Sequence, residues 1–368
     1  MRVFTQLMMR RFHSAVNYMN LDVVGSPTIN NGVVSGFSDS KYLEIPNFPT
    51  YTQDDRVEFV FNFTFDSSFV NSIIIGGAGA IIVPLVESNN KIKYYSNILG
   101  NATGTNTLIA NQNYFFKLIC DTNSYKAYIS TDGRTWTLDA SKSFSDTFSK
   151  SGVLTVGRNP SVSGQYLRGS IDINNSYIKI GSTKYNFQFT MPLTKVGSPT
   201  ITDGVVSGFS SSDYLNAYFG NAFNFDNDFE MNCDFTTGET IPSLAPLLIG
   251  SSATQGGFRI LSSKVTFSCR ISGVSTNYAL SLNQTLSANT NYVVNVKRVG
   301  DSIALKLYAN NVLLEEKTDN LENILFDWTG IKNIRIGYTS SNGAFDGSVN
   351  IPNCYVVESG TKYILTLP

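Results

Sequence analysis

The acidic residues of this sequence are candidates for a glycosidase site, because glycoside hydrolysis needs two carboxyl groups about 5 to 10 Å apart. Acidic residues that alternate along a strand share one face and could supply such a pair. Glu58 and Glu230 occupy equivalent positions in two similar halves of the chain, and each is expected to be the lone acid of its strand. We interpret both as solvated residues on an outer face, and we predict no catalytic residue. The nine glutamates are Glu44, Glu58, Glu87, Glu230, Glu239, Glu315, Glu316, Glu322 and Glu358.

Nucleophilic catalysis has few candidate residues in this chain. His13 is the only histidine and precedes both halves, which excludes a Ser-His or Cys-His pair inside either half. The cysteines do not recur between the halves, as a disulfide framework should, and they lack zinc-ligand spacing. We expect them to be small buried side chains in strands: Cys120, Cys233, Cys269 and Cys354. No glycine pattern indicates a nucleotide-binding loop, so no cofactor is predicted.

Calcium is the one metal compatible with the residue types. Its preferred ligands are carboxylate and amide oxygens, which residues 226–228 (Asp-Asn-Asp) and the pair Asp172 and Asn174 could supply. These two groups occupy unrelated positions in the two halves. We therefore interpret them as turn-forming residues and predict no metal site.

Aromatic side chains could bind the apolar faces of sugars. The candidates are Trp136 and three tyrosines that we expect to be exposed, Tyr94, Tyr95 and Tyr128. The segment 130–136, Ser-Thr-Asp-Gly-Arg-Thr-Trp, resembles the Asp-box of sialidases, one residue shorter, and that box is a structural hairpin. We predict a turn at Asp132-Gly133 and a core position for Trp136.

The elements that position these residues come from a tandem duplication. Val24–Leu43 returns as Val196–Leu215 with only four differences in twenty residues. Near-identity at this length settles the organisation before any local pattern. We predict an N-terminal arm over residues 1–20, a first module over 21–190 and a second over 191–368. The linker, Thr190–Lys195, is too short for a flexible tether, so we expect the modules to be held in a fixed relation.

The local pattern is that of β-strands almost throughout. In Val57–Phe65 the apolar residues alternate with polar ones, which predicts a half-buried strand. Pairs such as Asn31-Gly32 and Asp203-Gly204 are hairpin signals, because their turns need positive φ. Only Lys317–Asp327 could hold one helical turn. The sequence predicts an all-β chain of two tandem antiparallel β-sandwich jelly rolls.

Charge limits the partners. The net charge is −1 and charged residues make up 15% of the chain, which argues against nucleic acid and against an anionic membrane surface. No run is long and apolar enough to span a bilayer. Residues 1–20 carry Arg2, Arg10 and Arg11 and apolar residues at near-helical spacing. We interpret this arm as a helical anchor for a partner protein; the alternative is a packed or frayed helix without a partner.

Three segments resemble a known family. GVVSGFSDSKYLEIP (32–46) resembles the opening of concanavalin A-like, laminin-G-like jelly rolls, and NYFFKLICDTNSYKAYISTDGRTW (113–136) resembles their central hairpin. GSIDINNSYIKIGSTKY (169–185) resembles their closing strands, as found in bacteriophage tail and fibre proteins. The second half departs from the hairpin motif, with Asn310-Asn311 and Leu314 in place of Asp-Gly and Trp. The resemblance implies the lectin and glucanase fold but leaves function open, since this fold hosts many activities.

From the resemblance and the missing catalytic groups we expect a non-enzymatic structural or adhesion component of a virion. It would be assembled in the host cytoplasm, exposed on the virion surface and anchored to other virion proteins through residues 1–20. A homo-oligomer is compatible with this. The alternative is a carbohydrate-binding protein that recognises surface glycans, and a second alternative is a glycoside hydrolase.

Overall fold

The structure is a computed structural model. It describes residues 17–25, 27–66, 72–80, 82–218, 228–250, 256–273, 275–322, 324–326, 333–339, 343–358 and 360–367. The first sequence repeat (21–190, repeat 1) and the residues just before it carry β1(Asn17–Val24), β2(Thr28–Asn30), β3(Val33–Ser35), β4(Tyr42–Thr52), β5(Val57–Phe65), β6(Ser72–Ile73), β7(Ile75–Gly76), β8(Val83–Val86), β9(Ile92–Tyr95), β10(Ala102–Thr103), β11(Tyr114–Asp121), β12(Ser124–Ser130), β13(Thr137–Ser143), β14(Ser149–Val156), β15(Gly169–Ile180) and β16(Thr183–Val196).

The second sequence repeat (191–368, repeat 2) follows the same plan. After β16 it carries β17(Thr200–Thr202), β18(Val205–Ser207), β19(Tyr214–Tyr218), β20(Phe229–Thr237), β21(Leu244–Gly250), β22(Gly257–Leu261), β23(Lys264–Arg270), β24(Asn277–Thr285), β25(Asn291–Val299), β26(Ser302–Ala309), β27(Val312–Asn320), β28(Asn333–Ile336), β29(Tyr338–Thr339), β30(Gly343–Ala344), β31(Gly347–Asn350), the 3-10 turn η1(Ile351–Asn353), β32(Tyr355–Glu358) and β33(Thr361–Thr366).

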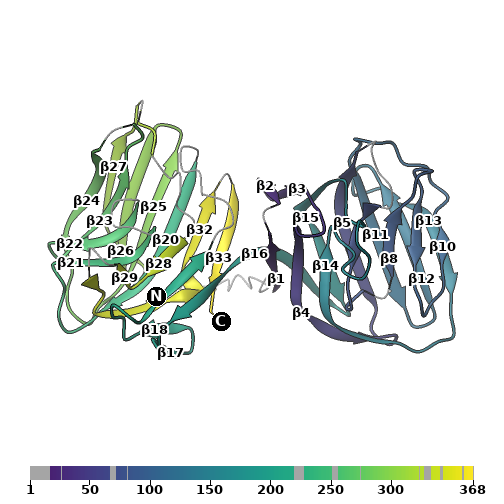
Figure 1. Cartoon of the computed structure of the whole chain (residues 1–368), viewed down its shortest axis with the longest axis horizontal. Coiled ribbons are helices and arrows are strands. Elements are labelled where there is room, and N and C mark those ends of the chain that lie inside the picture. Colours follow the sequence, from purple (N-terminus) through teal and green to yellow (C-terminus); the bar gives the residue numbers. More distant parts are fainter. Residues whose placement is uncertain are drawn as a thin grey trace, which may run out of the picture.

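The strands form β-sandwich jelly rolls, as predicted (Figure 1). In repeat 1 the hydrogen-bonded order is β13-β12-β11-β5-β15-β16-β1-β4-β14-β7. In repeat 2 the matching order is β27-β26-β25-β20-β32-β33-β16-β19-β28-β21. Equivalent strands hold equivalent places, so the duplication of the sequence is a duplication of the sheet topology.

Each repeat buries its own core. In β5 the alternation gives a buried row of Phe59, Phe61, Phe63 and Phe65. In repeat 2 the strand β20 points Phe229, Met231, Cys233 and Phe235 the same way. These rows belong to separate clusters of buried side chains, one for each repeat. Burial of apolar surface contributes about 25 cal/mol per Å², so these clusters stabilise the two sandwiches.

Strand β16 belongs to both repeats. Its first half pairs with β1 in parallel, with Met19 opposite Phe187 and Leu21 opposite Phe189. Its second half pairs in parallel with β33, with Met191 opposite Leu365. The last strand of repeat 1 is therefore also the first strand of repeat 2, and it lies between the two sandwiches in Figure 1. The predicted linker Thr190–Lys195 lies within this strand; the fixed relation of the modules and the boundary at residue 190 stay predictions.

The predicted arm overlaps the first strand. Residues 17–20 lie in β1 and pair with Tyr185 to Gln188 of β16, so they are not helical. The sequence pattern misled here because the apolar spacing of residues 4–12 was extended too far along the chain. Residues 1–16, with His13, lie outside the described residues.

The helical turn expected within Lys317–Asp327 is also wrong for its first part, because residues 317–320 belong to strand β27. The 3-10 turn η1 lies elsewhere, before β32. Within the described ranges, no helix has the length and apolar character needed to cross a bilayer.

Candidate functional site

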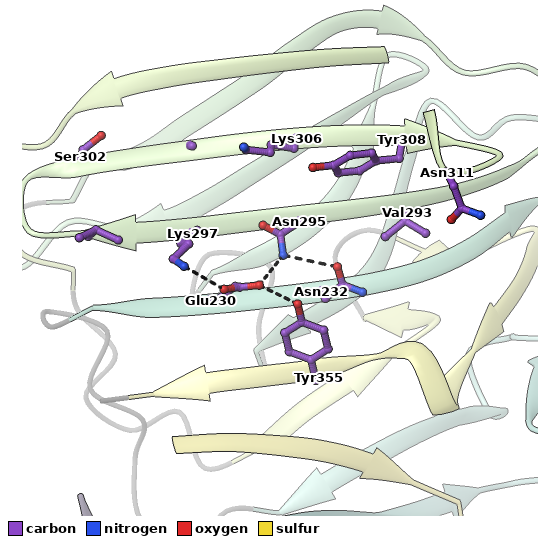
Figure 2. Close-up of a pocket in the computed structure, with 12 residues that line it drawn as sticks. Glu230, Asn232, Val293, Asn295, Lys297, Ser302, Lys306, Tyr308, Asn311 and Tyr355 are labelled. Carbon is purple, nitrogen blue, oxygen red and sulfur yellow. Dashed lines mark hydrogen bonds and ion pairs between the residues drawn. The ribbon is translucent and has the colours of Figure 1, made fainter. Parts of the chain in front are cut away.

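A groove of about 580 Å³ lies on the outer face of the sheet in repeat 2 (Figure 2). Residues of β20, β25 and β26 with an outward side chain form its floor, because successive side chains of a strand point to opposite faces. Met231 and Cys233 enter the core, whereas Glu230 and Asn232 face the groove. The lining residues are Glu230, Asn232, Val293, Asn295, Lys297, Val299, Ser302, Ala304, Lys306, Tyr308, Asn311 and Tyr355.

Glu230 is the centre of the polar contacts in this groove. Its Oε1 accepts hydrogen bonds from the Tyr355 hydroxyl at 2.6 Å and from Asn295 Nδ2 at 2.9 Å. Its Oε2 lies 3.5 Å from Lys297 Nζ. Asn295 Nδ2 also donates to Asn232 Oδ1 at 3.4 Å. One carboxylate of β20 therefore orients groups from the two strands beside it, β25 and β32 (Figure 2).

Glu230 is ionised, so it can accept hydrogen bonds but cannot donate a proton. Burial opposes its charge, but the hydrogen bonds from Tyr355 and Asn295 and the ammonium of Lys297 outweigh burial and hold the pKa of Glu230 below its ordinary value. Burial and the bond to Glu230 raise the pKa of Tyr355, so its hydroxyl keeps its proton. A general acid needs a pKa near the working pH, which Glu230 lacks.

Glu230 is not the lone acid of its strand, contrary to the prediction. Asp234 lies four residues further along β20 on the same face and is 5% exposed. Its Oδ1 accepts from Asn291 Nδ2 at 2.8 Å, and its Oδ2 accepts from Asn350 and Asn353 Nδ2 at 2.9 and 2.7 Å. Three amide donors neutralise the cost of burying this carboxylate. Asp234 therefore supports the sheet beneath the groove.

The cationic side chains of the groove have partners of their own. Lys297 faces Glu230, and Lys306 Nζ lies 3.1 Å from Glu316 Oε1. Beside the groove, Lys362 Nζ lies 3.6 Å from the centre of the Tyr355 ring, a cation–π distance. The two lysines that line the groove are thus each paired with a carboxylate of the protein.

Repeat 1 keeps the acid–tyrosine pair of this site. Glu58 Oε1 accepts a hydrogen bond from the Tyr177 hydroxyl at 2.8 Å, as Glu230 does from Tyr355. Lys184 Nζ lies 4.0 Å from the Tyr177 ring, the counterpart of Lys362. The pair therefore belongs to the duplicated unit, and it cannot by itself define a binding site.

The surroundings of the pair differ between the repeats. Alignment places Val60 where repeat 2 has Asn232, and Ile119 where repeat 2 has Lys297. Both replacements put an apolar side chain on the outer face. Among the described residues, the glutamate with both an amide and an ammonium partner from the adjacent strand is Glu230 of repeat 2.

Lys117 takes the place of Asn295 in repeat 1 and explains the position of Trp136. Its Nζ lies 3.8 Å from the Trp136 ring centre and 5.2 Å from that of Tyr128. Trp136 is half-buried on the outer face. The prediction of a core position for Trp136 is therefore wrong. The cation attracts the indole to the surface of the sheet.

The remaining aromatic candidates divide by exposure. Tyr94 is fully buried and donates to Asp139 Oδ2 at 2.5 Å, so it cannot stack on a sugar, contrary to prediction. Tyr95 is 43% exposed, and Tyr128 is half-buried. Neither belongs to the groove of repeat 2.

The turn predicted at Asp132-Gly133 is confirmed. Asp132 Oδ1 accepts from the backbone N–H of Thr135 at 2.7 Å and from Ser130 Oγ at 2.8 Å, and Gly133 has φ +70°. These bonds hold the pKa of Asp132 well below its ordinary range. The carboxylate closes a hairpin, as the Asp-box motif implied.

The calcium candidates that are described have hydrogen-bond partners within the protein, but Asp172 and Asn174 lie in β15, at an irregularity of its pairing with β5, and not in a turn as predicted. Asp172 accepts from Asn175 Nδ2 at 2.7 Å, and Asn174 Nδ2 donates to the backbone of Asn31 at 2.9 Å. Asp228 accepts from the backbone N–H of Gly300 at 2.7 Å. Residues 226 and 227 lie outside the described residues. Among the residues that are described, no group of three or more His, Cys, Asp or Glu side chains could hold a metal ion.

The cysteines are buried, as predicted, but Cys354 does not lie in a strand. All four are buried and unpaired in disulfides. Cys120, Cys233 and Cys269 lie in strands, whereas Cys354 follows η1. Burial raises the pKa of Cys120 to about 12, which keeps its thiol protonated and unreactive at neutral pH.

Sequence reasoning missed most of the groove. Asn295, Lys297, Tyr308 and Tyr355 were not singled out, because each is an ordinary outer-face residue when its strand is viewed alone. The signal that could have found them is the comparison of the repeats. At two outward positions repeat 2 carries a polar residue where repeat 1 carries an apolar one, namely Asn232 in place of Val60 and Lys297 in place of Ile119.

No protein-family model matches the chain, and no curated protein matches it. Among solved structures, domains LG4-5 of the mouse laminin alpha1 chain share 13% identity at TM-score 0.31, over 95% of this chain and 96% of that one. The CBM40 of a Ruminococcus gnavus sialidase, bound to alpha2,3 sialyllactose, shares 16% identity at TM-score 0.27, over 35% of this chain and 83% of that one. The enzymatically active domain of tailspike protein 2 of bacteriophage CBA120 shares 10% identity at TM-score 0.33, over 48% of this chain and 32% of that one. These neighbours are laminin G domains and other lectin-like jelly rolls; at such identities and TM-scores they assign no function to this chain.

Proposed function

We propose that this chain is a carbohydrate-binding protein without catalytic activity, and that the groove of repeat 2 holds the glycan. The observation that carries the proposal is the set of groups fixed around Glu230. The ionised carboxylate holds Asn295, Lys297 and Tyr355 within 3.5 Å of its oxygens. Sugar hydroxyls donate and accept hydrogen bonds, so carboxylate, amide and ammonium groups in fixed positions match them. Groups that are already ordered lose little entropy on binding.

Tyrosine rings supply the second element of a sugar site. Tyr308 lies on the opposite side of the groove from Tyr355, next to Lys306 and Asn311 (Figure 2). A half-buried tyrosine offers an apolar face and a polar hydroxyl at its end. This combination suits the apolar face and the hydroxyl rim of a pyranose ring.

Other ligand classes fit the groove less well. Nucleic acid binding depends on lysines and arginines that neutralise phosphates, whereas Lys297 and Lys306 here pair with carboxylates. A protein partner would favour an apolar centre with few charges. The groove has charged and amide groups at its centre instead.

The absence of catalysis is part of the proposal. Glu230 is a carboxylate of lowered pKa, and Asp234 is buried beneath three amides. Neither is placed to act as the general acid of glycoside hydrolysis. Release of reducing ends from a bound polysaccharide, lost in Glu230→Gln, would contradict this part. The virion role and the anchoring by residues 1–20 stay predictions from the resemblance.

Tyr308→Ala tests the groove directly. We expect affinity for the strongest neutral oligosaccharide on a glycan array to fall by about two- to tenfold, since an aromatic contact contributes roughly 0.5 to 1.5 kcal/mol. Isothermal titration calorimetry measures the change. Tyr128→Ala, on the corresponding face of repeat 1, is the matched control and should leave affinity unchanged. An array without any bound glycan, or equal losses in both variants, would contradict the proposal.

A further inference from the structure

The groove does not end at the edge of repeat 2. A second hollow of about 930 Å³ shares Glu230, Lys297 and Val299 with it and continues towards repeat 1. At its far end lie Asn30 and Asn31, which come from the first repeat. Each hollow alone has the size of a site for a small organic ligand. Together they form one trough that crosses from repeat 2 to repeat 1.

The turn of repeat 1 is fixed where it meets the trough. The backbone N–H of Gly32 donates to Thr361 Oγ1 of repeat 2 at 3.0 Å, in a buried contact. Asn174 Nδ2 donates to the carbonyl oxygen of Asn31 at 2.9 Å. Gly360 permits the approach, since a Cβ at that position would lie 2.0 Å from Asn31 Oδ1. The exposed amide of Asn30 is therefore presented by a rigid hairpin and not by a free loop.

The sequence of the duplicated segment singles out the same turn. Across twenty near-identical residues, two of the four differences are Asn30 in place of Thr202 and Asn31 in place of Asp203. The turn that borders the trough thus carries two neutral amides where its counterpart carries a hydroxyl and a carboxylate. Amides donate and accept at once, as sugar recognition requires.

We propose that the ligand is a linear, neutral oligosaccharide that runs from Tyr308, over Glu230, to the Asn30–Asn31 turn. This rests on the proposed function and adds that repeat 1 completes the site of repeat 2. We infer a neutral ligand because the two lysines that line the groove, Lys297 and Lys306, each already face a carboxylate. The linear form follows from the lining of the two joined hollows, which extends from Tyr308 in repeat 2 to Asn30 and Asn31 in repeat 1. The shared strand β16 and the Gly32–Thr361 contact keep its two ends in register.

Chain-length dependence of binding tests this inference. The full chain is titrated with cello-, malto- and chito-oligosaccharides from the disaccharide to the hexasaccharide. We expect affinity to rise with length in at least one series. Asn30→Ala and the double variant Asn30→Ala/Asn31→Gly, which keeps a residue that accepts positive φ, should lower hexasaccharide affinity by about tenfold and leave the disaccharide unchanged. Thr202→Ala, the equivalent position in repeat 2, is the control.

Each outcome is decisive for one of the two proposals. If oligosaccharides bind through Glu230 but the Asn30 variants match wild type at every length, the trough is not one site and the inference is wrong while the proposed function stands. If affinity is independent of length, the inference fails in the same way. If no oligosaccharide of any series binds but another glycan on the array does, the inference is wrong and the proposed function stands. If neither the series nor the array shows a bound glycan, both fail.

Discussion

Glu230→Ala lowers glycan affinity by about 100-fold, because hydrogen bonds to charged groups contribute roughly 1.5 to 3 kcal/mol and 1.4 kcal/mol is tenfold. The variant removes a hydroxyl acceptor and also releases the groups that the carboxylate positions. Tyr355 and Asn295 lose their common acceptor, and Lys297 loses its counter-ion. Calorimetric titration with the glycan selected on the array gives the affinity.

Glu58→Ala is the matched control for this change. Glu58 accepts from Tyr177 as Glu230 accepts from Tyr355, so both variants remove an equivalent carboxylate–tyrosine bond. Any loss of affinity through general weakening of the sheet should appear in both. We expect the control to bind as wild type does. Loss in the Glu58 variant alone would place the site on repeat 1 and contradict our account.

Asp234→Ala destabilises repeat 2 by about 3 kcal/mol, since it leaves buried amide donors without their charged acceptor. Asn291, Asn350 and Asn353 all donate to this carboxylate, which is 5% exposed. The free energy of unfolding from urea denaturation, followed by circular dichroism, measures the loss. One transition is fitted for each core, because two cores need not unfold together.

Asn62→Ala is the control for the buried aspartate. Asn62 holds the equivalent place in repeat 1 and is 4% exposed, but it carries no charge. We expect a loss of about 1 kcal/mol there. Equal losses in the two variants would show that burial alone, and not the three amides around a carboxylate, accounts for the effect.

The fold could be predicted from the sequence because its signals are local or repeated. Alternation in Val57–Phe65 gives the strand β5 with its buried phenylalanines, and the near-identity of 24–43 and 196–215 gives the tandem design. The shared strand β16 could not be predicted. Its two halves contact different repeats, and nothing in Thr183–Val196 itself indicates where one neighbour ends and the next begins.

The groove was beyond prediction from single strands. Glu230, Asn295 and Tyr355 are far apart in the sequence and meet only through the register of β20 with β25 and β32. The position of Trp136 also depends on a contact with strand β11 that its own segment does not reveal. A tryptophan in a β-protein is usually assigned to the core, and only the position of Lys117 explains why this one stays at the surface.

The stoichiometry of glycan binding tests the central claim most directly. The two repeats share a fold and an acid–tyrosine pair. In the part of the chain that the structure describes, the polar groove around Glu230 lies in repeat 2, and we propose that the Asn30–Asn31 turn completes it. Calorimetric titration of the full chain with the selected hexasaccharide should therefore give one bound ligand per chain. Two ligands of equal affinity per chain would show that the duplicated unit itself is the site, and this would contradict the account.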